Sequence, residues 1–66
     1  MKNRIRVARA EVRMTQQQLA EAIGVSRQTI NAIESGKFVP STVLALKMAH
    51  IFELPVEDIF ILDDED

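Results

Sequence analysis

Residues 15–36 read TQQQLAEAIGVSRQTINAIESG, and the rest of the chain is arranged around this stretch. Thr15 and Gln18 have the spacing of a capping box, in which the two side chains satisfy free amides at the start of a helix. The helix that begins there has an apolar stripe formed by Leu19, Ala20 and Ile23. Gly24 follows the stripe, and because glycine adopts backbone angles that other residues avoid, it predicts a sharp turn.

A second helix is predicted directly after this turn. Ser26 is a favoured residue at a helix N-cap, and Gly36 suits the left-handed backbone that ends many helices. Between them, over residues 27–35, Ile30 and Ile33 share an inner face. Two short helices joined by a turn that contains glycine form a helix-turn-helix, a motif that places its second helix in the major groove of DNA.

The segment TQQQLAEAIGVSRQTINAIESGK resembles the helix-turn-helix of the phage repressor and Cro type, the XRE family. The resemblance continues through FVPSTVLALKMAHIFELPVEDIF, which is similar to the fourth and fifth helices of that family, and it covers residues 3–60. The residues at the family's spacings are Gly24, Ser26, Ile30, Glu34, Gly36 and Pro40. The resemblance implies an all-α fold, a compact five-helix domain of the lambda-repressor type, and it is strongest to the small stand-alone repressors.

Length and composition limit what this chain can be. Its 66 residues make one domain, and without cysteine it has neither a disulfide nor a thiolate metal site to stabilise it. We expect the helix-turn-helix domain to span 1–62 and an acidic, flexible tail to span 63–66. No apolar run reaches the length of about 18 residues that a membrane span needs, and a signal-peptide core is absent. These features predict a cytoplasmic protein with no membrane partner.

The charges of the chain are unevenly distributed. Residues 1–47 carry all eight Lys and Arg against three acids, a net charge of +5, whereas residues 48–66 carry seven acids and no Lys or Arg, a net charge of −7. Attraction to phosphate is local, because salt screens it within about 10 Å. The overall charge of −2 therefore does not argue against DNA binding by the basic part.

A first helix is predicted over residues 3–13, with Ile5, Ala8, Arg9 and Val12 on one face. Arg9 is the charged member of this face, and burying its charge without a partner would be strongly destabilising. Glu34, near the end of helix 27–35, is the candidate partner, and the family resemblance implies the same pair. We interpret the pair as structural, fixing how helix 27–35 packs without contacting a ligand.

After Gly36, the sequence predicts two more helices. Phe38 is expected to fold back onto the core, and Ser41 to cap a fourth helix over 42–52. The inner face of that helix is assigned to Ala45, Leu46, Met48, Ala49 and Phe52. A fifth helix is predicted to begin with Pro55 at its first position and to end at about residue 60.

The run Ile59-Phe60-Ile61-Leu62 is more apolar than this part of a small domain needs. Exposed apolar patches mark interfaces, and in the XRE family the fifth helix and the residues after it commonly build a two-fold homodimer. We therefore assign a dimer interface to Val56, Ile59, Phe60, Ile61 and Leu62. The alternative is that two of these residues close the core of the monomer. A short C-terminal strand at Ile61–Leu62 also fits the sequence.

The outer face of helix 27–35 carries the candidate DNA contacts. The base-reading residues that the resemblance implies are Arg27, Gln28 and Ala32, with Thr29 and Asn31 as additions. Arginine pairs with guanine and glutamine with adenine at the edges that face the major groove. Alanine offers only apolar contact, so we expect Ala32 to make the range of bases recognised by direct contact narrower. The phosphate candidates are Gln16, Ser26 and Lys37, with Asn31 as an alternative to its base-reading role. Gln16 corresponds to a family residue that also supports the second helix.

An enzyme is not expected. The single histidine, His50, has no cysteine or serine at a suggestive spacing, there is no glycine-rich phosphate loop, and the tail carboxylates form no preorganised metal site. No metal and no cofactor are therefore predicted.

Two classes of function remain. The first is a homodimeric repressor that binds double-stranded DNA at an inverted-repeat operator, with half-sites roughly 34 Å apart. The second is a protein-interaction module on the same fold, such as an antitoxin that binds its toxin. The lack of an additional toxin-binding segment counts against the second class, and a toxin-like reading frame beside the gene would favour it.

Overall fold

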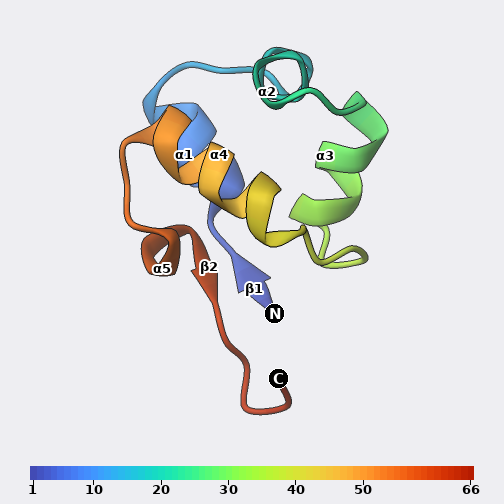
Figure 1. Cartoon of the computed structure of the whole chain (residues 1–66), viewed down its shortest axis with the longest axis vertical. Helices are drawn as coiled ribbons and strands as arrows, with labels where there is room; N and C mark the ends of the chain where they lie inside the picture. Colours follow the sequence, from blue (N-terminus) through green and yellow to red (C-terminus); the bar gives the residue numbers. More distant parts are fainter.

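The computed structural model describes residues 1–66 as five helices and a two-stranded sheet. The elements in chain order are β1 (Lys2–Asn3), α1 (Ile5–Glu11), α2 (Gln16–Ile23), α3 (Arg27–Glu34), α4 (Thr42–Phe52), α5 (Val56–Ile59) and β2 (Phe60–Ile61). Figure 1 shows α2 and α3 forming one corner of the molecule, with the small sheet at the opposite end. The prediction of a mostly helical five-helix fold is confirmed. None of the helices has the length and apolar character required to cross a membrane.

The predicted N-caps start three of the helices. The Thr15 hydroxyl accepts a hydrogen bond from the Gln18 backbone N–H at 3.0 Å, and the Gln18 side-chain oxygen accepts one from the Thr15 N–H at 2.9 Å. Ser26 and Ser41 cap α3 and α4, each accepting from the amide three residues further on. Each cap satisfies an amide that the helix itself leaves unpaired, so the helix starts are set by local sequence.

Left-handed backbone separates α2 from α3 and directly follows the C-cap of α3, Ser35. Gly24 has φ 80° and Gly36 has φ 81°, angles that cost glycine little and other residues more. Gly24 is the C-cap of α2, and its N–H donates to the Ala20 carbonyl. The turn of the helix-turn-helix therefore depends on the glycine that the sequence placed there.

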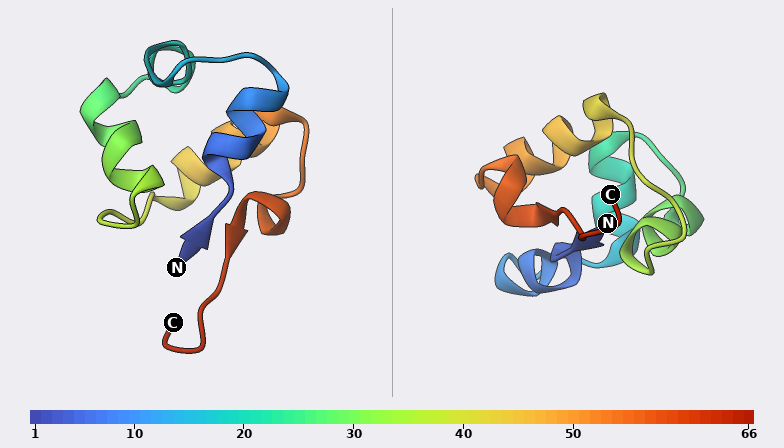
Figure 2. Two further views of the ribbon diagram at one scale, coloured as in Figure 1. Left: turned by 180° about the vertical axis from the view of Figure 1, so that it is seen from behind. Right: turned by 90° about the horizontal axis from the view of Figure 1, so that it is seen from below.

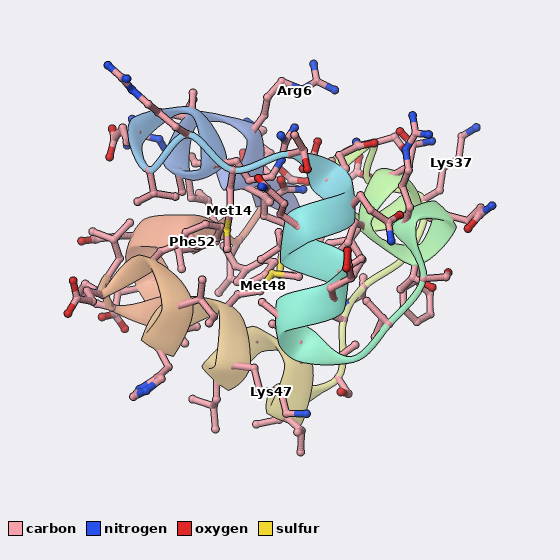
Figure 3. The ribbon with its side chains drawn as sticks, turned by 90° about the horizontal axis from the view of Figure 1, so that it is seen from above. Arg6, Met14, Lys37, Lys47, Met48 and Phe52 are labelled. Carbon is pink, nitrogen blue, oxygen red and sulfur yellow. The ribbon has the colours of Figure 1, made fainter.

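One core joins all five helices. Its eleven buried residues are Ile5, Ala8, Leu19, Ala20, Ile23, Ile30, Ile33, Met48, Phe52, Ile59 and Phe60. Figure 3 shows Met48 and Phe52 pointing into the space that the helices enclose. Helices of this length are marginal in isolation, so shared burial of these apolar faces is what stabilises them.

Three side chains that the sequence placed in the core are exposed, namely Val12, Phe38 and Leu46. Val12 follows the last residue of α1, so the helical spacing that put it on the inner face no longer applies. Phe38 is held at the end of α3 by its N–H, which donates to the Ala32 carbonyl, while its side chain faces outward. The inner face of α4 is centred on Met48 and Phe52, which puts Leu46 on the other side of that helix.

The chain after α4 differs in detail from the prediction. Pro55 is the N-cap of α5 rather than its first helical residue, because its ψ of 147° is extended. Phe60 is also extended and leaves α5 for β2, so the strand begins one residue before the predicted Ile61–Leu62. β2 pairs antiparallel with β1, with Lys2 opposite Ile61 and Asn3 opposite Phe60. Both views in Figure 2 show the two strands side by side.

The acidic segment after β2 lies against the start of the chain. The Met1 ammonium group is 3.1 Å from an Asp63 carboxylate oxygen and 3.2 Å from one of Asp66. The hydrogen bond that this ammonium group donates to Asp63, then the one it donates to Asp66, raises the pKa of the Met1 amine above its ordinary 8.0. These contacts between Met1 and the acidic segment therefore hold the two ends of the chain together beyond the β1–β2 sheet. The flexibility expected of 63–66 stays a prediction.

Candidate nucleic-acid interface

Six of the predicted DNA-contact residues gather around one open hollow of about 470 Å³ on the outer face of α3. We call it the α3 hollow; its lining residues are Gln16, Arg27, Gln28, Asn31, Ala32, Ser35 and Lys37. The lining contains two cations, no carboxylate and a single apolar residue. Such a surface offers hydrogen-bond donors and positive charge, the features that bases and phosphates require.

Two predicted contacts, Ser26 and Thr29, lie outside the α3 hollow. The Ser26 hydroxyl accepts from the Thr29 backbone N–H at 3.1 Å and lies 3.0 Å from the Thr29 hydroxyl. The Ser26 hydroxyl thus caps α3, and the Thr29 hydroxyl is hydrogen-bonded to it.

Ser35 lines the α3 hollow although the sequence analysis did not assign it. It is four residues after Asn31 and seven after Gln28, so helical spacing alone would have put it on their face. Its hydroxyl donates to the Ala32 carbonyl at 3.1 Å. Ser35, the C-cap of α3, lies within the predicted helix 27–35 but was not among the contact positions that the family resemblance implied.

Arg9 and Glu34 make the contact that the sequence predicted. Arg9 Nε donates to Glu34 Oε2 at 2.6 Å and Arg9 Nη2 donates to Glu34 Oε1 at 3.2 Å, a two-point contact between α1 and α3. The Glu34 side chain is 1% exposed and that of Arg9 is 15% exposed. The third guanidinium nitrogen, Nη1, donates to the Met14 carbonyl at 2.9 Å and so ties the α1–α2 connection to the same pair.

Side chains from α2 and from the outer face of α1 also contact the Glu34 carboxylate. Gln16 Nε2 donates to Glu34 Oε1 at 3.1 Å, and Arg6 Nε lies 3.6 Å from the same oxygen. Burial alone would raise the pKa of Glu34, but the hydrogen bonds from Arg9 and Gln16, with the charges of Arg9 and Arg6, lower it below its ordinary 4.5. Glu34 is therefore an ionised, acceptor-only group at neutral pH that joins three helices.

Arg6 and Lys37 both reach outward into solvent (Figure 3). Arg6 comes from α1 and Lys37 from the segment after α3, so cations of separate elements surround the end of α2 that carries Gln16. The basic part of the sequence thus supplies a positive surface around the α3 hollow.

The structure corrects the predicted dimer surface. Ile59 is wholly buried and Phe60 nearly so, because the single turn of α5 and the pairing of β2 with β1 direct both side chains into the core. These two residues close the monomer, as the alternative in the sequence analysis had it. Val56 is partly buried, and Ile61 and Leu62 are the exposed members of the set, with Leu62 77% exposed.

No group of three or more His, Asp or Glu side chains is arranged to hold a metal ion. His50 instead lies on α4 beside exposed apolar residues such as Val43 and Leu46. The α3 hollow, by contrast, is lined mostly by polar and basic side chains.

Similarity to known proteins agrees with this geometry. The family model described as Helix-turn-helix (HTH_3) matches residues 5–59. The chain is 52% identical over 66 residues to the uncharacterised HTH-type transcriptional regulator MJ0272 of Methanocaldococcus jannaschii, with 100% of both chains covered. It is 46% identical over 65 residues to the uncharacterised HTH-type transcriptional regulator YgzD of Bacillus subtilis, with 98% of each covered.

Solved structures extend the similarity to three dimensions. A putative DNA-binding protein from Bacteroides fragilis superimposes with a TM-score of 0.80 and 34% identity, over 88% of this chain and 94% of that one. The restriction-modification controller protein C.AhdI from Aeromonas hydrophila has a TM-score of 0.76 and 27% identity, over 85% of each chain.

Proposed function

Because this chain belongs to the XRE-type helix-turn-helix family of transcriptional regulators, which bind DNA and are not enzymes, we propose that it is a sequence-specific repressor. It binds as a homodimer to an inverted-repeat operator in the cytoplasm and blocks transcription from the promoter there. The observation that carries the proposal is the α3 hollow, where polar and basic side chains from α2, α3 and the following segment face outward together.

In the proposed complex, α3 lies in the major groove with its first residues toward the bases. Arg27 and Gln28 are both exposed, so neither has to leave the core to reach a base edge. Arginine bonds guanine O6 and N7, and glutamine bonds adenine N6 and N7. Lys37 and Gln16, at the rim of the α3 hollow, are assigned to phosphate oxygens, which fix the register of the protein on the duplex.

The homodimer is proposed from the exposed apolar residues at the end of β2. Ile61 and Leu62 are exposed, and a domain of this size is only marginally stable alone. Burying this pair against the same pair of a second copy gives a two-fold axis. A two-fold protein with one α3 per subunit matches half-sites one helical turn apart, roughly 34 Å.

The DNA-binding proposal is tested by selecting binding sites from a random duplex library, followed by fluorescence titration of the selected site at several salt concentrations. Gln28→Ala should weaken binding to that site by about 1–3 kcal/mol and relax the preference at one position of each half-site. Gln17→Ala is the matched control, since Gln17 is an exposed glutamine of α2 that does not line the α3 hollow. Equal losses for the two variants, or binding without sequence preference, would refute the docking of α3.

The dimer proposal is tested by sedimentation and by the length of the DNase footprint. Leu62→Asp should convert the dimer to a monomer and leave only weak half-site binding, because a charge replaces an exposed apolar contact. Leu46→Asp is the matched control, an exposed leucine on α4. A monomeric wild-type protein, or a dimer that survives Leu62→Asp, would contradict this interface.

A further inference from the structure

Arg6 is an exposed cation at the edge of the α3 hollow, and it is not one of the residues assigned to DNA. It belongs to α1, and its side chain is 76% exposed. Its Nε lies 3.6 Å from Glu34 Oε1, the same oxygen that accepts a hydrogen bond from Gln16 Nε2 at 3.1 Å. Because both nitrogens are close to one oxygen atom, the Arg6 guanidinium group lies beside the Gln16 amide, which lines the α3 hollow.

The charge of Arg6 is not cancelled within the chain. Glu34 is the only acid with which Arg6 forms an ion pair, and Arg9 holds that carboxylate by the shorter contact of 2.6 Å. One carboxylate therefore faces two guanidinium groups, and the cluster keeps an excess of positive charge. The Arg9 side chain is only 15% exposed, so Arg6 is the member that presents this excess to the solvent.

The outer nitrogens of Arg6 are free to bind a ligand. The hydrogen bonds to Glu34 come from Arg9 and Gln16, and none in the chain involves Nη1 or Nη2 of Arg6. A guanidinium group binds a phosphate best through two parallel N–H groups, which these nitrogens can supply. Figure 3 shows Arg6 and Lys37 extending from the same edge of the molecule, Arg6 from α1 and Lys37 from the segment after α3.

We propose that Arg6 binds the DNA phosphate next to the one assigned to Gln16, and that α1 is thereby part of the DNA interface. This inference rests on the proposed function. When α3 lies in the major groove, Gln16 meets the backbone at the edge of the groove, and Arg6 beside it meets the same strand. The contact adds affinity and fixes the register of the protein, but it reads no base.

The position of Arg6 also bears on how a carboxylate can lie close to bound DNA. Glu34 is ionised, and a phosphate that binds Gln16 approaches its negative charge. Like charges repel, most strongly where water is excluded. Arg6 offsets this repulsion, because its Nε faces the carboxylate while its outer nitrogens face the phosphate. Removing Arg6 therefore takes away a phosphate contact and also leaves the charge of Glu34 less well compensated.

The experiment titrates the site that the wild type selects from a random duplex library, and a scrambled duplex, at several salt concentrations. Arg6→Met should lower affinity for both duplexes alike, about tenfold at about 0.1 M salt, and reduce the slope of log affinity against log salt by about one. Arg6→Lys, which keeps the charge, should keep the slope. Arg4→Met is the matched control, since Arg4 is an exposed arginine that lines a different hollow with Glu11 and Asp58. Thermal melting checks that each variant is folded, and Arg6→Gln is a second neutral variant.

The phosphate itself is located by replacing the backbone phosphates of the selected site, one at a time, with neutral methylphosphonates. Each phosphate that the wild type contacts should show a loss of affinity when it is made neutral. One of these losses should be absent for Arg6→Met, because the cation that bound there is already gone. That phosphate should be next to the one at which Gln16→Ala shows no loss.

Four outcomes would overturn the inference while leaving the proposed function in place. Unchanged affinity and slope for Arg6→Met would make Arg6 an ordinary solvated side chain. Equal losses for Arg4→Met would assign the effect to charge at a distance. A loss confined to the selected site would mean that Arg6 acts through Glu34 on the placement of α3. Losses at every contacted phosphate that are the same for Arg6→Met as for the wild type would exclude a direct contact. If the wild type selects no sequence at all, the proposed function itself fails, and this inference fails with it.

Discussion

Replacing Arg9 with methionine tests how α1 is joined to α3. The change removes the hydrogen bonds that Nε and Nη2 donate to Glu34 and the one that Nη1 donates to the Met14 carbonyl. Methionine keeps much of the apolar stem of arginine, so the lost contacts are mainly polar. Glu34, whose side chain is 1% exposed, is left with Gln16 at 3.1 Å and Arg6 at 3.6 Å.

The cost follows from leaving a buried carboxylate without its main partner. Removing one member of a buried ion pair destabilises a protein by about 3–5 kcal/mol. Because Gln16 and Arg6 still reach Glu34, we expect Arg9→Met to fall at the lower end, about 3 kcal/mol. In a domain of this size, each kcal/mol lowers Tm by about 4–8 °C, so a decrease of about 15 °C is expected.

Urea and thermal unfolding followed by circular dichroism at pH 7 would measure this decrease. Arg6→Met is the matched control, because Arg6 is 76% exposed and lies 3.6 Å from Glu34, a geometry that contributes under about 1 kcal/mol. Unfolding free energies of Arg9→Met and the wild type that agree to within about 0.5 kcal/mol would refute the buried-pair interpretation.

The same variant should show a characteristic dependence on pH. The pKa of Glu34 is lowered in the folded protein from its ordinary 4.5, so ionised Glu34 stabilises the fold above that pH. This contribution is lost as the pH falls through the lowered pKa of the folded state. The difference in stability between Arg9→Met and the wild type should therefore shrink below pH 4.5. A difference that does not change with pH would assign the loss to packing rather than to charge.

Two further predictions concern a helix end and the rim of the α3 hollow. Glu53 caps α4 with φ 53°, so Glu53→Gly should raise the unfolding free energy by about 0.5–1 kcal/mol in thermal melts. A decrease in stability would mean that the Glu53 side chain makes a stabilising contact. Lys37→Ala should weaken binding to all DNA sequences alike and reduce the slope of log affinity against log salt by about one. Lys47→Ala, whose side chain lies 3.5 Å from the Ile23 carbonyl outside the α3 hollow, should leave that slope unchanged.

Features decided by neighbouring residues could be predicted from the sequence. The caps at Thr15, Ser26 and Ser41 depend on contacts three residues away, and the helix starts follow from them. The contact of Arg9 with Glu34 spans a greater distance along the chain, but a charge on an apolar face restricts the choice of partner to a few acids.

Features decided by distant residues could not be predicted. β1 has only two residues, too few for an alternating pattern, and it exists because β2 lies beside it. Phe38 and Leu46 were wrongly placed in the core because which face of a segment is covered depends on where other elements pack. The same applies to Ile59 and Phe60, whose burial follows from the return of the chain to β1.

For the candidate interface, helical spacing identified most of the lining of the α3 hollow but could not orient its side chains. The family resemblance implied that Gln16 supports helix 27–35, but not that it contacts both Asn31 and Glu34, since those contacts depend on the angle between α2 and α3. The hydrogen bonds that join Gln16 to Asn31 and to Glu34 were therefore found only in the three-dimensional structure.

The pairing of β1 with β2 also has a consequence for how the chain folds. The turn between α2 and α3 forms from residues close together in sequence, whereas the sheet joins Lys2 to Ile61 across nearly the whole chain. Closing so long a loop costs more conformational entropy than closing a local turn, so the contact between β1 and β2 is expected to form late. During synthesis α1 to α4 emerge before Ile59 and Phe60 can cover their apolar faces. The nascent chain is therefore expected to remain partly open, and accessible to chaperones and proteases, until β2 has been made.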